Sequence, residues 1–91
     1  MNLSGKVRIP PHVMARQVGD EQVILDLASG KYFGLDPVGA RIWQLLVDGK
    51  TLEEVCSVMV VEYQVGRSTV EHDLQALLEA LVGHQLLAED A

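Results

Sequence analysis

The chain has 91 residues, a formal net charge of −6, a hydrophobic content of 48% and an aromatic content of only 4%. This length allows one domain, spanning 1–91, and the hydrophobic content is too high for a disordered chain. Nucleic-acid binding draws its affinity mainly from lysine and arginine, so an acidic chain without a basic cluster disfavours that class of partner. Cys56 is the only cysteine, which excludes an internal disulfide and fits a reducing compartment.

The apolar runs of the sequence predict a cytoplasmic protein. The N-terminal "MNLSGKVRIPPHV" lacks the apolar run of a signal peptide. The longest apolar stretch, "VCSVMVV", is too short and too interrupted to span a bilayer. We therefore expect neither export nor a membrane partner.

Three segments in the first half of the chain have the character of strands. They are "HVMARQV" (12–18), "EQVILDL" (21–27) and "KYFGL" (31–35). The links "GD" and "ASG" between them are short, and "GD" suits a two-residue hairpin turn with glycine first. Such short links predict three antiparallel strands in a meander.

The third strand leads directly into a helix start. Asp36 occupies an N-cap position and Pro37 follows at the first helical position, where its missing N–H costs nothing. Ile42 and Trp43 lie on the predicted core face of this helix. Gly49 can adopt the left-handed conformation that ends it.

Two more helices follow, each with a predicted capping box. Thr51 and Glu54 form the first box, and Ser68 and Glu71 form the second. Leucines at helical spacing fill the last helix up to Gly83. The tail "HQLLAED" is expected to be extended, with its leucines packed on the core.

The order of three strands and then three helices predicts an α+β fold. A three-stranded antiparallel N-terminal sheet followed by three helices is a winged-helix-like arrangement. The sequence contains no linker, internal repeat or low-complexity tract.

No pattern of catalytic or metal-binding residues is present. His12, His72 and His84 have no partner at metal-ligand spacing. Cys56 lies on the apolar face of the second predicted helix, where a cysteine is usually inert. The glycines of "GKYFGLDPVG" lack the spacing of a phosphate-binding loop. We therefore expect neither an enzyme nor a cofactor.

The last strand of the meander has one unpaired edge. Exposed edges are normally blunted by charge, proline or a covering element, and here only Lys31 offers charge while Gly34 leaves the backbone accessible. The edge could simply be short and partly covered. Alternatively, it could accept a partner peptide as an added strand, with affinity from main-chain hydrogen bonds and specificity from side-chain pockets.

Two stretches of the sequence resemble the PqqD-like family, also called RiPP recognition elements. They are "VILDLASGKYFGLDPVGARIWQLLVDGKTLEEV" and the later "VEHDLQALLEALVGHQLL", and the resemblance runs from His12 to Leu87. The segment "YFGLDPVGARIW" is most similar to the stand-alone leader-binding proteins of lasso peptide biosynthesis. The resemblance implies a winged-helix-like domain without catalytic function. It also implies that the leader of a ribosomally made precursor peptide docks as an antiparallel strand on the third strand, in a groove shared with the third helix.

The resemblance also implies partners and site residues. In the lasso branch the leader offers a tyrosine, a proline and a leucine to apolar pockets. A separate transglutaminase-like cysteine peptidase then removes the leader, and a separate ATP-dependent cyclase closes the ring. Carried over by position, the peptide-binding residues are Lys31, Tyr32, Phe33, Gly34, Leu35, Val70, Asp73, Leu74 and Leu77.

These residues cannot all contact a peptide in the same way. Strand side chains alternate between faces, so some point away from the groove. Leu78 and Leu81 are expected in the core. Asp73 interrupts the apolar stripe of the last helix and could pair with a basic leader residue, accept a hydrogen bond, or be an ordinary solvated carboxylate.

Two other functions remain open. A similar domain serves radical-SAM peptide maturation, as in pyrroloquinoline quinone biosynthesis. A DNA-binding winged helix would use "STVEHDLQALLEALV" as its recognition helix, but this segment contains only acidic charges, which disfavour the major groove.

Overall fold

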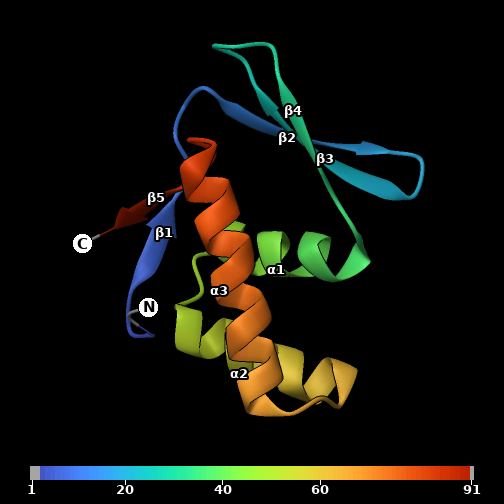
Figure 1. Ribbon diagram of the computed structural model, residues 1–91, viewed down its shortest axis with the longest axis vertical. Helices are drawn as coiled ribbons and strands as arrows, with labels where there is room; N and C mark the ends of the chain where they lie inside the picture. Colours follow the sequence, from blue (N-terminus) through green and yellow to red (C-terminus); the bar gives the residue numbers. More distant parts are fainter. Residues whose placement is uncertain (1–2, 91) are drawn as a thin grey trace.

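The computed structural model describes residues 3–90 and contains the predicted meander (Figure 1). Its strands are β2 (Val13–Val18), β3 (Glu21–Asp26) and β4 (Tyr32–Leu35), in the antiparallel order β2-β3-β4. Gly19 turns the first hairpin with φ at +61°, and Gly30 turns the second with φ at +77°. Both values lie in the left-handed region that glycine adopts without a steric penalty. The predicted strands and their connections are therefore confirmed, and each strand is one residue shorter than predicted at one end and agrees with the prediction at the other.

Strand β4 joins helix α1 (Pro37–Val47) through the single residue Asp36. The carboxylate of Asp36 accepts a hydrogen bond from the N–H of Gly39 at 2.7 Å. A Cβ atom at Gly39 would lie 3.3 Å from Asp36 Oδ1 and 3.4 Å from Leu35 Cδ2. Glycine at this position therefore lets the first turn of α1 pack closely on the end of β4. The helix ends as expected, with Gly49 at a φ of +84°.

Helix α2 (Leu52–Tyr63) begins at the predicted capping box. Thr51 accepts a hydrogen bond from the N–H of Glu54 at 3.1 Å, and the carboxylate of Glu54 accepts one from the N–H of Thr51 at 2.9 Å. This backbone hydrogen bond, together with the one from the Thr51 side chain, lowers the pKa of Glu54.

Helix α3 (Arg67–Gly83) begins differently from the prediction. Its N-cap residue is Gly66, with no side-chain capping bond, so the expected box of Ser68 and Glu71 is wrong. Arg67 forms ion pairs with Glu71 and with Glu53 of α2, so Glu71 is held by a guanidinium. The helix therefore starts one residue before Ser68, where the arginine can tie α3 to α2.

Helix α1 packs next to β3 and β4, and α2 packs against α1 and α3 at the end of the molecule away from the sheet (Figure 1). The core lies between these elements. Ile42 and Trp43 of α1 and Leu78 and Leu81 of α3 are buried, as predicted. The remaining buried residues are Ile24, Leu35, Leu45, Leu46, Leu52, Val55, Cys56, Met59, Val70, Leu74, Leu86 and Leu87. The α+β arrangement of an antiparallel sheet followed by three helices is thus confirmed.

A second, two-stranded sheet joins the two ends of the described chain. It consists of β1 (Lys6–Arg8) and β5 (Ala88–Asp90), paired antiparallel with Val7 opposite Glu89. An extended tail was expected from the sequence, but its pairing with β1 was not predicted. Within residues 3–90, no helix has the length and apolar character needed to cross a membrane.

Candidate functional site

Strand β4 is an edge strand, and no described segment pairs with its outer flank. The N–H of Asp26 donates to the carbonyl of Lys31 at 2.8 Å, and β3 and β4 continue in the same register to Gln22 opposite Leu35. Hydrogen-bonded and non-hydrogen-bonded pairs alternate along an antiparallel ladder. Phe33 and Leu35 therefore bond to β3, whereas the N–H and C=O groups of Tyr32 and Gly34 face the open flank. Those two residues offer a peptide backbone four unpaired polar groups.

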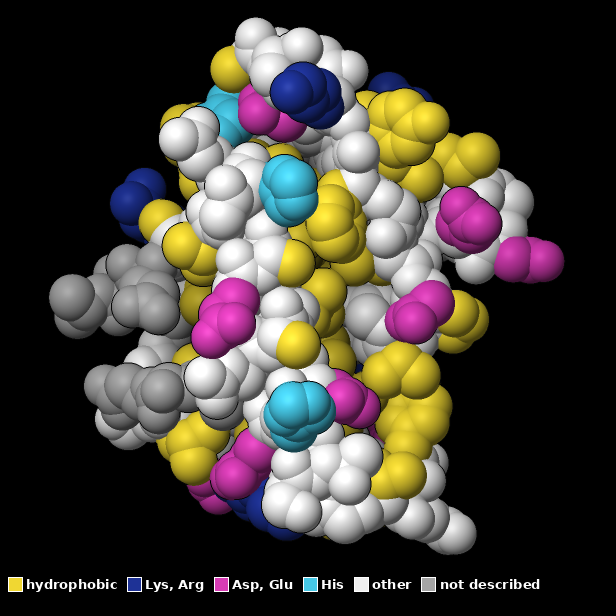
Figure 2. All heavy atoms as spheres, in the orientation of Figure 1, with side chains coloured by type: hydrophobic (Ala, Val, Ile, Leu, Met, Phe, Trp, Pro, Cys, Tyr) yellow, Lys and Arg dark blue, Asp and Glu magenta, His cyan; other side chains and the backbone are white. Residues whose placement is uncertain are grey.

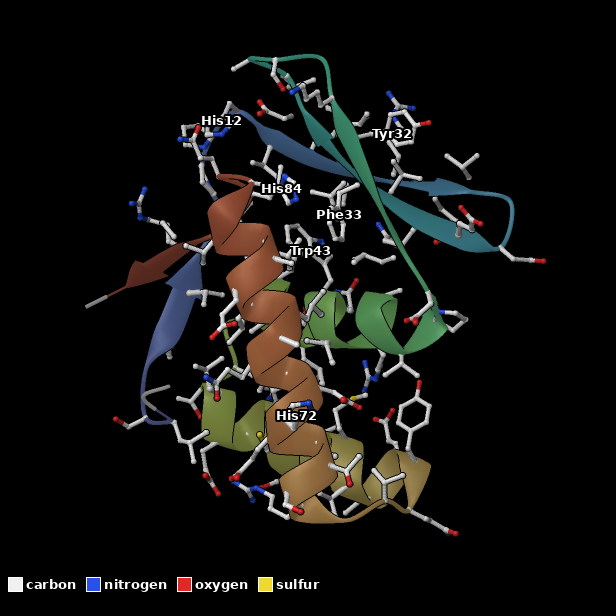
Figure 3. All side chains as sticks on the ribbon, in the orientation of Figure 1. His12, Tyr32, Phe33, Trp43, His72 and His84 are labelled. Atoms are coloured by element: carbon white, nitrogen blue, oxygen red, sulfur yellow. The ribbon has the colours of Figure 1, made fainter. Side chains whose placement is uncertain are left out.

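The side chains of β4 alternate between the two faces of the sheet. Phe33 is half-buried and Leu35 is buried, both on the face covered by the helices, whereas Tyr32 is 75% exposed. Figure 3 shows Phe33, His84 and Trp43 on the side of β4 that faces α3, with Tyr32 pointing away. The added Cβ of a residue replacing Gly34 would have only Glu21 Oε2 nearby, at 4.0 Å. The backbone at Gly34 is thus open to an approaching chain.

A groove with an apolar floor runs between β4 and α3. Figure 2 shows a band of hydrophobic side chains along the flank of α3, on the side where β4 descends toward α1. The rings of Phe33 and His84 lie 5.5 Å apart at an interplanar angle of 52°. Leu77 of α3 is half-buried and packs against the core below. A chain lying in this groove would have the backbone of β4 on one side and apolar side chains beneath it.

Each end of the groove has a pocket. The upper pocket, about 170 Å³ in volume, lies between the turn before β4 and the end of α3. Its lining includes Asp26, Lys31, Phe33 and His84. Burial raises the pKa of the Asp26 carboxyl group, but the hydrogen bonds that this group accepts from Ser29 and Ala28 lower the pKa by more. The pKa of Asp26 is therefore below its usual value. This pocket is therefore polar on one wall and aromatic on the other.

The lower pocket, about 150 Å³ in volume, lies where α1 begins, α2 ends and α3 begins. Its apolar lining includes Val38, Tyr63 and Val65, which are each about two-fifths exposed. Asp73 of α3 also lines it, and among residues 3–90 its carboxylate has no hydrogen bond or ion pair. An apolar side chain carrying a donor at its tip would suit such a pocket.

Comparison with known proteins identifies the family. Residues 21–87 match the family described as coenzyme PQQ synthesis protein D (PqqD). The chain belongs to the PqqD family. No curated protein sequence matches the chain.

Two solved structures are similar to this chain over most of its length. TbiB1, solved in complex with the TbiA(beta) leader peptide, is 48% identical, with a TM-score of 0.83, and the match covers 88% of this chain and 93% of that one. A lasso peptide synthetase B1, also solved with its leader peptide, is 32% identical, with a TM-score of 0.85, over 90% and 96% of the two chains. The resemblance to PqqD-like recognition elements is therefore confirmed.

Four of the nine expected site residues of this PqqD-family chain lie along the groove. Tyr32, Phe33 and Gly34 form the accessible part of β4, and Leu77 lines the groove opposite them. Val70 and Asp73 reach the lower pocket instead. Lys31 lies in the turn before β4, where its N–H donates to Ser29 Oγ at 3.2 Å.

Three expected site residues have little surface for a peptide to touch. Leu74 is fully buried, Leu35 is 4% exposed, and Val70, which lines the lower pocket, is 6% exposed. They support the groove from below. His84 and the exposed apolar residues of the lower pocket were not among the site residues predicted from the sequence. These residues lie at or next to the ends of helices, where helical periodicity does not predict whether a side chain is buried or exposed. Their exposure becomes visible only when the structure brings the helix ends together.

The described residues bring together little that could perform covalent chemistry. Cys56 is fully buried, and burial raises the pKa of its thiol, which disfavours the nucleophilic thiolate. His12 is engaged with the carbonyl of Gln85 at 3.0 Å from Nε2. Among residues 3–90, no three His, Cys, Asp or Glu side chains are placed to hold a metal ion. The arrangement is suited to binding an extended peptide.

Proposed function

We propose that this chain binds the leader segment of a ribosomally synthesised precursor peptide in lasso peptide biosynthesis. The leader adds to the open flank of β4 as an antiparallel strand, in the groove shared with α3. The observation that carries the proposal is the free backbone of Tyr32 and Gly34 beside an apolar groove. The two similar structures, each solved with a leader peptide, support the same ligand class.

The binding mode explains how one small protein can hold a disordered peptide. The leader loses conformational entropy when it docks, so it needs contacts that do not depend on a fixed side-chain geometry. Main-chain hydrogen bonds to Tyr32 and Gly34 supply such contacts, and the two pockets select the side chains at either end. The unpaired carboxylate of Asp73 favours a leader residue with a cationic or hydroxyl tip in the lower pocket.

Delivery to a separate enzyme completes the proposed function. The bound precursor is presented to a transglutaminase-like cysteine peptidase that removes the leader, and an ATP-dependent cyclase acts afterwards.

The second candidate function is to bind a peptide for a radical-SAM maturation enzyme. The family description favours this function because it refers to coenzyme PQQ synthesis. The peptide-binding step would be the same in both pathways.

Tyr32→Pro tests the proposed docking strand. Proline removes the N–H that faces the open flank and leaves the β3 ladder intact, because Tyr32 makes no ladder bond. We expect the affinity for the cognate leader to fall at least ten-fold, measured by fluorescence anisotropy with labelled leader peptide.

Tyr32→Ala is the matched control, since it removes the outward side chain but keeps the N–H. It should retain affinity within a few-fold, and circular dichroism should show both variants folded. Leader binding by a folded Tyr32→Pro protein at the parental affinity would refute strand addition at β4.

A further inference from the structure

Gly34 leaves a gap among the outward side chains of β4, directly beside the open flank. Ile24 is fully buried and lies opposite Phe33, so these two residues point toward the helices and their neighbours on each strand point away. Gly34 lies opposite Val23 and therefore belongs to the outward set. Because glycine has no side chain, the outward position between Val23 and the open flank is empty.

The side chain of Glu21 reaches toward this gap. Glu21 is the first residue of β3 and, two residues before Val23, it also points outward. Its Oε2 atom lies 4.0 Å from the position that a Cβ atom would have at Gly34. Among residues 3–90, the Glu21 carboxylate has no hydrogen bond or ion pair. It can therefore pair with a group that enters the gap from the flank.

The surroundings of the gap are acidic. It opens into a hollow of about 410 Å³ whose lining includes Asp20, Glu21 and Asp36, and no lysine or arginine of residues 3–90 lines this hollow. Figure 2 shows acidic side chains where the β2–β3 hairpin ends, on the right of the view. The Asp36 carboxylate already accepts a hydrogen bond from the N–H of Gly39. Arg16 of β2 also points outward but forms no ion pair with Glu21.

The register of an added strand brings one leader residue to the gap. Tyr32 and Gly34 present their N–H and C=O groups to the open flank, so each would form a hydrogen-bonded pair with one leader residue. Directly paired residues have their side chains on the same face of a sheet. The leader residue that pairs with Gly34, which we call residue p, therefore points outward, whereas its two neighbours in the leader point into the groove.

A long basic side chain suits residue p. Gly34 offers no side chain to block it, so the side chain of residue p can lie across the glycine toward β3. The Glu21 carboxylate already lies near β4, so this side chain has to cross about one strand spacing, roughly 4.8 Å, to meet it. Lysine and arginine cover such a distance with an apolar stem and carry a cation at the tip. A glutamate at residue p would instead be repelled by Glu21.

We propose that Glu21 determines a preference for lysine or arginine at residue p of the leader. The inference rests on the proposed leader binding at β4 and adds a charge requirement to it. The contact lies on the opposite face of the added strand from the groove and its two pockets. The leader is therefore recognised on both faces, by pockets on the inward side and by a carboxylate on the outward side.

The test measures how residue 21 changes the charge preference along the leader. The probes are synthetic, fluorescein-labelled versions of the cognate leader in which each position in turn is lysine, glutamine or glutamate. Anisotropy measures their affinities for the parent protein, Glu21→Gln and Glu21→Lys. The matched control is Glu79→Lys, which reverses the charge of an exposed carboxylate on α3 that accepts a hydrogen bond from Gln75.

We expect one leader position at which lysine binds the parent protein about three-fold more tightly than glutamine at low salt, as an exposed charge pair does. Glu21→Gln should remove this preference, and Glu21→Lys should reverse it in favour of glutamate. Glu79→Lys should leave it unchanged. High salt should weaken it, because exposed charges are screened.

The outcomes separate this inference from the proposed function. The absence of any charge preference in the parent protein, or a preference that stays the same in both Glu21 variants, would overturn the inference while leader binding stayed intact. A preference that Glu79→Lys changes as much as Glu21→Lys does would also overturn it, because net charge alone would then explain the effect. Failure of the unmodified leader to bind the parent protein would instead refute the proposed function.

Discussion

Tyr32 and Phe33 are adjacent residues with opposite roles, and the difference follows from strand geometry. Phe33 directs its backbone to β3 and its ring to the groove, where it meets His84. Tyr32 directs its backbone to the open flank and its ring to the face of the sheet that turns away from the helices (Figure 3). In the proposed binding mode the leader therefore contacts the backbone of one residue and the side chain of the next.

Cys56 should be unreactive in the folded protein. It is fully buried, and burial raises the pKa of its thiol, so both access and the thiolate fraction are low. We expect no reaction with Ellman's reagent at neutral pH over minutes and complete reaction in denaturant. Rapid stoichiometric labelling with unchanged circular dichroism would contradict the burial.

For single residues, the sequence predicts which side chains lie on an apolar helical face better than it predicts which of them remain exposed. The core positions of Cys56, Ile42 and Trp43 could be predicted because each lies on an apolar helical stripe. Leu74 and Leu77 could not be separated in the same way, because the apolar stripe of α3 serves both the core and the groove. Only the packing of α3 against the other elements shows that Leu74 is buried and Leu77 half-buried.

At the scale of elements, capping chemistry fixes where the helices begin. Thr51 and Glu54 satisfy two backbone N–H groups at the start of α2. Ser68 has the same sequence pattern with Glu71, but Arg67 holds Glu71 and the helix starts earlier. The sequence predicted the first box correctly because nothing competes with it. The prediction failed at the second because Arg67, four residues before Glu71 in the same helix, binds the Glu71 carboxylate, while its second ion pair with Glu53 of α2 depends on tertiary structure.

The two capping sites form a matched pair for mutation. Thr51→Ala removes a side-chain cap and should cost about 1 kcal/mol of unfolding free energy. Ser68→Ala removes no cap, so it should change the unfolding free energy by less than about 0.5 kcal/mol. Urea unfolding followed by circular dichroism measures both. Equal losses for the two variants would show that Ser68 caps α3 in solution.

At the scale of the whole molecule, a small core supports a groove that is left unfilled. The chain buries aliphatic residues from the sheet, all three helices and the tail, and the β1–β5 pair ties its ends together. That pairing could not be predicted, because two three-residue strands far apart in the chain carry no local pattern. The meander and helices could be predicted, because each is marked by its own turns, caps and periodicity.

Core and groove should respond differently to the same truncation. Leu74→Ala removes a fully buried side chain and should cost about 2–5 kcal/mol of unfolding free energy. Leu77→Ala should cost less, because Leu77 is half-buried, and should weaken leader binding more than it weakens the fold. Thermal unfolding and leader anisotropy on both variants separate the two effects. A larger stability loss for Leu77→Ala than for Leu74→Ala would contradict these assignments.

Hydrogen exchange of the β4 amides, with and without cognate leader, tests strand addition most directly. Phe33 and Leu35 bond to β3, so their amides should exchange slowly in both states. Tyr32 and Gly34 should exchange fast in the free protein and become protected when the leader binds. Protection that appears elsewhere while the Tyr32 and Gly34 amides stay unprotected at saturating leader would contradict the account.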